Sequence, residues 1–181
     1  MTLTVVTPPA GAALSLAAAK EYLRIGHDGE DALVSTLISA AEARLEIVGG
    51  IALVSRTVRR SWSAWPVGLT RGGVCLAPSP ATALVSVELK DADGVGDLVT
   101  GRFQLMDGRL SLRPFTPLPG MPPGGRAEVT FVAGYGAATD VPDDLVQALK
   151  RLVHVAYRRG EEGDLPQDVA AAVGAHTQVR L

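Results

Sequence analysis

Residues 126–160, RAEVTFVAGYGAATDVPDDLVQALKRLVHVAYRRG, combine a strand, a glycine-containing turn and a long helix, and this stretch decides the fold. At its start, small and apolar side chains alternate with more polar ones, a period-2 pattern that predicts a half-buried strand. Gly134-Tyr135-Gly136 interrupts this pattern. Pro142 then opens an amphipathic helix that ends at Gly160, because proline fits the first helical turn and glycine the position after the last.

This helix, predicted over residues 142–159, carries different charges at its two ends. Asp143 and Asp144 lie where the helix dipole favours anions, and Arg158 lies where it favours cations. Leucine and valine side chains recur along one side, which we expect to face the core. The other side is a basic stripe at helical spacing, formed by Gln147, Lys150, Arg151, His154 and Arg158.

Composition bounds the class of protein. With 181 residues, 47% of them apolar but only 4% aromatic, we expect a single domain with a core of Val, Leu and Ala. A net charge of −2 excludes a global basic field for binding nucleic acid or anionic lipid. The lone Cys75 excludes an intramolecular disulfide and a Cys-based zinc site. With no signal-peptide pattern and no apolar run of about 20 residues, the sequence predicts a soluble, intracellular protein.

Two helices are predicted near the N-terminus. Ser15 is a suitable N-cap for a helix over residues 15–24, and Asp28 for a second helix over residues 29–48 that ends at Gly49-Gly50. The second helix has an apolar stripe, predicted to be buried, at Leu33, Leu37, Ile38, Ala41, Leu45 and Val48. Its opposite face is polar and acidic, with Asp31, Ser35, Ser39, Glu42 and Glu46.

Residues 51–133 are predicted to form a small antiparallel β lobe. Their hydrophobic period is two, and Asp91-Ala92-Asp93-Gly94 has the composition of a hairpin turn. Strands flanked by helices indicate an α+β fold, with a helical base of two N-terminal helices and one long C-terminal helix, and the β lobe between them. We expect one domain over residues 1–160 and an extended C-terminal tail over residues 161–181. Within the tail, residues 165–173 are compatible with a short helix.

The sequence offers little for catalysis. Its histidines are scattered, and Cys75 lies in an apolar strand context that favours a small buried residue over a nucleophile. Gly134-x-Gly136 follows a strand and precedes a helix, but it lacks the third glycine and the βαβ unit of a dinucleotide-binding site. Asp91 and Asp93 are explained by the turn, because the rest of a calcium loop is missing. We therefore predict no catalytic residue, no cofactor and no metal.

Three interpretations of the basic stripe remain open: a solvated face, a nucleic-acid contact or a protein interface. Nucleic-acid binding is the weakest, because aromatic residues are not interleaved with the cations. If the acidic face of residues 29–48 and the basic stripe lie on opposite sides of a subunit, they would meet between neighbours in a head-to-tail ring. The subunit interface predicted in this way comprises Asp31, Glu42, Glu46, Lys150, Arg151 and Arg158.

Several motifs in succession resemble those of phage head–tail connector (adaptor) proteins. The opening LSLAAAKEYLRI at residues 14–25 is similar to the opening motif of that family, although Ala18 replaces its usual acid and Tyr22 a frequent His. The later motifs that carry the resemblance are GIALV at 50–54, WSAWP at 62–66, LAP at 76–78, DG at 93–94, GYG at 134–136, VPDDL at 141–145 and AYRR at 156–159. The similar proteins include adaptors of tailed phages and of phage-derived gene transfer agents.

The resemblance implies a structural role without catalysis. Connectors of this family form a ring, commonly of twelve subunits, beneath the portal protein. The ring extends the DNA channel and receives the stopper or tail-completion protein, and DNA passes through it without specific binding. The resemblance places the protein in the neck of a virion or phage-like particle, with synthesis in the host cytoplasm and no membrane contact. Alternatives are another neck or tail-completion protein, or a small ligand-binding or enzyme domain.

The resemblance also gives the C-terminal tail a role. In connectors this segment reaches the portal or a neighbouring neck component. The residues expected to anchor it there are Leu165, Pro166, Val169, Val173, Val179, Arg180 and Leu181.

Overall fold

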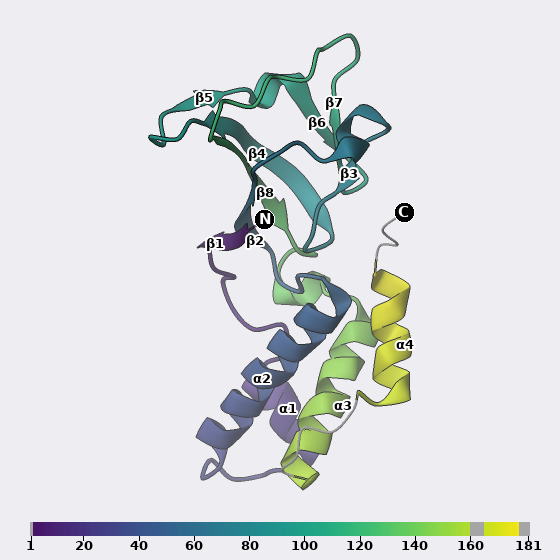
Figure 1. Ribbon diagram of the computed structural model, residues 1–181. Helices are drawn as coiled ribbons and strands as arrows, with labels where there is room; N and C mark the ends of the chain where they lie inside the picture. Colours follow the sequence, from purple (N-terminus) through teal and green to yellow (C-terminus); the bar gives the residue numbers. More distant parts are fainter. Residues whose placement is uncertain (1, 160–164, 178–181) are drawn as a thin grey trace. The chain divides into compact units, whose positions relative to one another are not determined.

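The computed structural model describes residues 2–159 and 165–177, which form two compact units (Figure 1). The β unit comprises the described residues 2–9 and 55–134, and the helical unit comprises the described residues 10–54, 135–159 and 165–177. The strands pair antiparallel throughout the described sheets, so the predicted α+β class is confirmed.

Within the described residues, the larger sheet of the β unit has five strands in the order β1-β2-β8-β4-β5. They are β1 (Thr2–Thr7), β2 (Arg56–Trp62), β8 (Arg126–Ala133), β4 (Ala81–Lys90) and β5 (Gly96–Leu98). The central strand β8 pairs on both sides, and its Phe131 lies opposite Val58 and Leu84. Alternation along β8 puts Val129 and Phe131 on an apolar face and Glu128 and Thr130 on a polar one.

The smaller sheet has the order β3-β7-β6 among the residues that the structure describes. These strands are β3 (Val74–Cys75), β7 (Arg109–Leu112) and β6 (Phe103–Met106). Two short 3₁₀ turns, η1 (Val67–Thr70) and η2 (Thr100–Arg102), border it. Phe103 and Leu110 are buried, and the Trp65 ring packs on Phe103 with centroids 5.3 Å apart. This aromatic pair anchors the small sheet.

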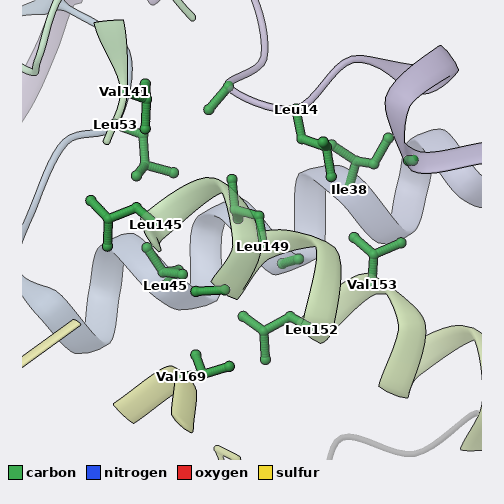
Figure 2. Packing of buried hydrophobic residues seen from close by; sticks show 14 of the residues in the cluster. Leu14, Ile38, Leu45, Leu53, Val141, Leu145, Leu149, Leu152, Val153 and Val169 are labelled. Carbon is green, nitrogen blue, oxygen red and sulfur yellow. The ribbon is translucent and has the colours of Figure 1, made fainter. Parts of the chain in front are cut away.

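The helical unit contains α1 (Leu16–Leu23), α2 (Asp31–Gly49), α3 (Asp143–Arg159) and α4 (Gln167–His176), with the 3₁₀ turn η3 (Ala138–Asp140) before α3. Figure 2 shows its core, in which leucines of α3 meet side chains of α2 and of the segment after it. Leu45, Leu145 and Leu149 are fully buried there. The apolar side predicted for α3 therefore packs inward.

Two expectations about α2 are wrong. Asp28 does not cap the helix: its N-cap is Glu30, without a side-chain cap, and Asp28 instead accepts a hydrogen bond from Lys20 Nζ at 2.7 Å. Leu33 and Val48 are exposed, because the buried line is turned slightly around the helix. The buried residues, four or three positions apart, are Val34, Ile38, Ala41, Leu45 and Gly49.

The tail is not extended at residues 167–176: α4 continues past Val173, where the short helix compatible with the sequence would end, and it packs into the core of the helical unit. Val169 and Val173 are one turn apart on the same side of α4, and both are buried. Gly49 of α2 allows a close approach, since a Cβ added there would lie 2.8 Å from Val173 Cγ1. The two buried valines, one of them packed on Gly49, fasten this helix to the core of the helical unit.

The first residues form a strand that the sequence prediction left outside the β lobe. β1 pairs with β2, with Thr4 opposite Arg59 and Leu3 opposite Arg60. All six residues of β1 are exposed, because the strand lies at the edge of the sheet. Its apolar and polar residues alternate only as far as Val5, and its partner strand lies about fifty residues or more away in the sequence.

Candidate assembly surfaces

The acids of the predicted subunit interface are held by contacts within the chain. Glu42 Oε1 accepts hydrogen bonds from the backbone N–H groups of Ala13, at 2.6 Å, and Leu14, at 3.2 Å. Glu46 Oε1 accepts one from Leu53 N at 3.0 Å, and Asp31 Oδ1 lies 2.6 Å from Lys20 Nζ. These carboxylates fasten the segments before and after α2 to the helix. The exposed small or apolar residues of α2 are Ala32, Leu33, Ser35, Thr36, Ser39, Ala40, Ala43, Ile47 and Val48.

The side chains of the basic stripe of α3 have different surroundings. Arg151 Nε lies 3.7 Å from Asp168 Oδ2 of α4, so this cation faces the neighbouring helix. His154 meets the Tyr22 ring of α1 edge-on, with centroids 5.9 Å apart. Arg158 is exposed and Lys150 is half-buried. Two of the predicted interface cations, Lys150 and Arg158, therefore carry no ion pair within the chain among the interactions described.

The end of α4 is fastened by a polar network. Tyr135 Oη lies 3.0 Å from His176 Nδ1, and His176 Nε2 lies 2.7 Å from Asp144 Oδ2. Burial raises the pKa of Tyr135, and the nearby Asp144 carboxylate raises it further, so the phenol stays neutral at physiological pH. Thr177 Oγ1 adds a hydrogen bond to the carbonyl of Gly49 at 3.3 Å. The network ties α4 to α2 and to the start of α3.

Most of the predicted tail anchors are occupied within the fold. Leu165 packs partly buried against the core, Pro166 is the N-cap of α4, and Val169 and Val173 are core residues. Val179, Arg180 and Leu181 lie outside the described residues. The sequence pattern does not distinguish valines of the core from valines that bind a partner, because both are apolar residues spaced one helical turn apart.

A charge cluster on the polar face of the larger sheet was missed by the sequence prediction. Glu128 is buried, with Arg126 Nε at 2.7 Å, Lys90 Nζ at 3.1 Å and Arg59 Nη1 at 3.5 Å from its carboxylate. Burial alone would raise the pKa of Glu128, but the hydrogen bonds from Arg126 and Lys90 outweigh it and hold the pKa below its usual value. The cluster joins three strands distant in sequence, which a local pattern does not reveal.

The glycines Gly134 and Gly136 serve the backbone. Their φ angles are 124° and 134°, which disfavour any side chain. The boundary between the two units falls directly after Gly134. This conformational requirement explains the motif without a nucleotide.

Among the described residues, no group of three or more His, Cys, Asp or Glu side chains could hold a metal ion. No helix in the described part of the chain has the length and apolar character needed to cross a membrane.

Solved structures of particle necks match the whole chain. One is a chain of the neck of an empty gene transfer agent particle computed with C6 symmetry; it is 31% identical, with a TM-score of 0.84 over 100% of this chain and 97% of that chain. The chain belongs to the family of gene transfer agent neck proteins. The predicted resemblance to head–tail connectors is thereby confirmed at the level of the family, with the particle neck as the location of its members.

Two further structures of the same kind match this neck protein equally completely. A chain of the virion of a native gene transfer agent particle is 30% identical with a TM-score of 0.84, and a chain of the neck of a native particle computed with C12 symmetry is 30% identical with a TM-score of 0.82. Each match covers 100% of this chain and 97% of the other. No protein-family model and no curated protein sequence matches this chain.

Proposed function

We propose that this neck protein is the head–tail adaptor of a gene transfer agent or a related phage-like particle. As an adaptor it forms a ring beneath the portal protein, extends the DNA channel and receives the stopper or tail-completion protein. Its role is assembly, with no bond made or broken. The observation that carries the proposal is the end-to-end similarity, at 31% identity, to a chain of a particle neck.

The proposed ring has twelve subunits, matching the symmetry stated for one of the similar neck structures, and its subunits contact each other through α2 and α3. Such a ring repeats one heterologous contact around the axis. The contact brings Lys150 and Arg158 of α3 to the exposed side of the neighbour's α2, where the small exposed residues let the neighbour approach closely. A mildly acidic subunit suits a channel through which DNA must move without tight phosphate binding.

The proposal is tested by mixing the purified chain with the portal protein of the same particle and imaging the complex by electron microscopy. We expect an added ring on the tail-facing side of the portal, with one copy of this chain per repeat. A chain that stays unbound at concentrations well above those of the portal, or a density elsewhere in the neck, would contradict the adaptor role. The second result would favour another neck or tail-completion protein.

A further inference from the structure

Phe115 has an unusual position in the β unit. It is the most exposed large apolar residue of the described chain, and its φ angle is +58°, in the left-handed region. Thr116 N donates a hydrogen bond to the Arg113 carbonyl at 3.2 Å, which closes a four-residue turn with Pro114 second and Phe115 third. A positive φ at the third position is usually left to Gly or Asn, because other side chains adopt it only at an energetic cost.

This turn is firmly attached to the buried part of the unit. Arg113 Nε donates to the Phe103 carbonyl at 3.1 Å, and Arg113 N donates to the Arg102 carbonyl at 2.9 Å. Further along the same loop, Trp65 Nε1 donates to the Pro119 carbonyl at 2.8 Å. Phe103 is itself a core residue. The turn therefore presents Phe115 from a fixed base, and a contact made through this ring loses little conformational entropy.

The fold of the isolated chain gains nothing from this arrangement. The ring buries no surface, and glycine would fit the backbone better. Aromatic side chains that are exposed on a strained, well-anchored turn have the properties of interface anchors, whose gain appears when a partner buries them. Arg113, the first residue of the turn, and Arg102, whose carbonyl accepts from Arg113 N, are both exposed, so the partner surface needs acidic groups beside an apolar centre.

We propose that Phe115 is the anchor through which the β unit docks on a different protein of the particle neck, in an apolar pocket rimmed by acidic side chains. This inference rests on the proposed adaptor function and names the residue that makes one of its contacts. Truncating a well-buried aromatic anchor weakens binding about 30-fold or more.

A neighbouring copy of the chain fits the turn less well. Residues 55–134 contain nine Lys and Arg against six Asp and Glu, so this part of the chain has a net charge of +3. In a cyclic ring, equivalent parts of neighbouring subunits lie at the same height along the axis, so basic β units are adjacent. An acidic rim is therefore expected on another protein.

DNA also fits less well. Single-stranded nucleic acid is bound by several aromatic rings in succession, whereas Phe115 is the one Phe, Tyr or Trp in residues 104–130. A DNA duplex moving through a channel offers no unstacked base to receive a single ring. The Phe115 turn is therefore assigned to a protein partner.

The decisive variant is Phe115→Gly, which removes the ring and suits the backbone. Its melting temperature should equal that of the wild type or exceed it by up to a few degrees. Val67→Ala, which alters another exposed apolar residue of the same unit, is the matched control. Particles assembled with each variant are imaged by electron microscopy. We expect Phe115→Gly to keep the ring on the portal and to lose the next neck component, while Val67→Ala keeps both.

The outcomes of this experiment separate the two proposals. If the wild-type chain forms no ring on the portal, the adaptor function fails. If the ring forms and Phe115→Gly particles retain the next component at the wild-type level, the docking proposal fails alone. A photo-crosslinking benzoylphenylalanine at position 115 identifies the partner in assembled particles. Linkage to a different neck protein supports the proposal, and linkage to another copy of this chain, linkage to DNA or no linkage overturns it.

Discussion

Individual carboxylates of this protein fix segments that the hydrophobic pattern leaves unplaced. Glu42 accepts hydrogen bonds from two backbone N–H groups of the segment before α1, and Glu128 forms ion pairs with cations of β2, β4 and β8. A buried backbone N–H without an acceptor, or a cation without its partner, costs about 1–3 kcal/mol. At this scale, residues predicted as outward contacts turn out to hold the chain together.

Glu128 gives the stability of the β unit a defined pH dependence. Its folded pKa lies below the value of 4.5 expected for an unfolded glutamate, so its contribution is complete above about pH 4.5 and is lost as pH falls through the folded pKa. We predict that Glu128→Gln lowers the free energy of unfolding by about 1–3 kcal/mol at neutral pH. The difference from the wild type should shrink below about pH 4.

Urea denaturation at a series of pH values measures this effect. Glu21→Gln, at an exposed position of α1, is the matched control and should change stability little at any pH. If the difference in the free energy of unfolding between Glu128→Gln and the wild type is the same at neutral and acidic pH, the pKa of Glu128 is not lowered in the folded protein.

At the scale of elements, α4 depends on the absence of a side chain at Gly49. A Cβ there would meet Val173 Cγ1 at 2.8 Å and Ile51 Cγ1 at 3.2 Å. We predict that Gly49→Ala destabilises the protein by about 1–3 kcal/mol through overpacking, although alanine favours helices. Val173→Ala should cost about 1–2 kcal/mol by removing buried methyl groups. The double variant should be more stable than the sum of the two single changes predicts.

This double-mutant cycle, measured by thermal or chemical unfolding, tests whether α4 packs where the structure places it. Strict additivity of the two free-energy changes would mean that Gly49 and Val173 do not touch. As a control, Gly174→Ala changes a glycine of α4 that has no neighbour within 4 Å of an added Cβ, and it should not couple to Gly49→Ala.

The packing of α4 also changes how the C-terminal segment should be tested. Deleting residues 165–181 would remove Val169 and Val173 from the core, so lost portal binding could follow from misfolding. Deleting residues 178–181 leaves α4 complete. If the end of the chain contacts the portal, as the resemblance to connectors implies, the short deletion should abolish portal docking in a pull-down assay without lowering the melting temperature. Docking at the wild-type level would remove the end of the chain from the portal interface.

At the scale of the whole molecule, local signals in the sequence predicted much of the fold. Pro142, the paired acids after it and the leucine spacing predicted α3, whose start lies one residue from the expected position. Ser15 does cap α1, since its Oγ accepts a hydrogen bond from Ala18 N. These signals act within one or two helical turns, so a single sequence suffices to read them.

What the sequence did not reveal depends on distant partners. The role of Glu42 requires Ala13 to lie beside α2, and the Glu128 cluster requires β2 and β4 to flank β8. The pairing of β1 and the burial of α4 are likewise set by segments far along the chain. Phe115 adopts a positive φ that sequence preferences argue against.

Charge distribution gives a prediction at the scale of the assembly. If cations of α3 face acids of a neighbouring subunit, then the double change Lys150→Glu and Arg158→Glu should reduce ring formation strongly at low salt and less at high salt, where charges are screened. Arg71→Glu, at an exposed position of the β unit, is the control. Electron microscopy of portal complexes at two ionic strengths measures the fraction with a ring. Ring formation unaffected by the double change at both would exclude this contact.

The path of the chain has a consequence for biosynthesis. Within the described residues the chain begins in the β unit, enters the helical unit after residue 9, returns at residue 55 and leaves again after residue 134. Neither unit is a continuous segment. The sheet cannot gain its central strand β8 before most of the protein has left the ribosome, and α2 must wait longer still for α3. Nascent chains therefore expose unpaired strand edges and half-covered helices until translation nears its end, when both cores close together.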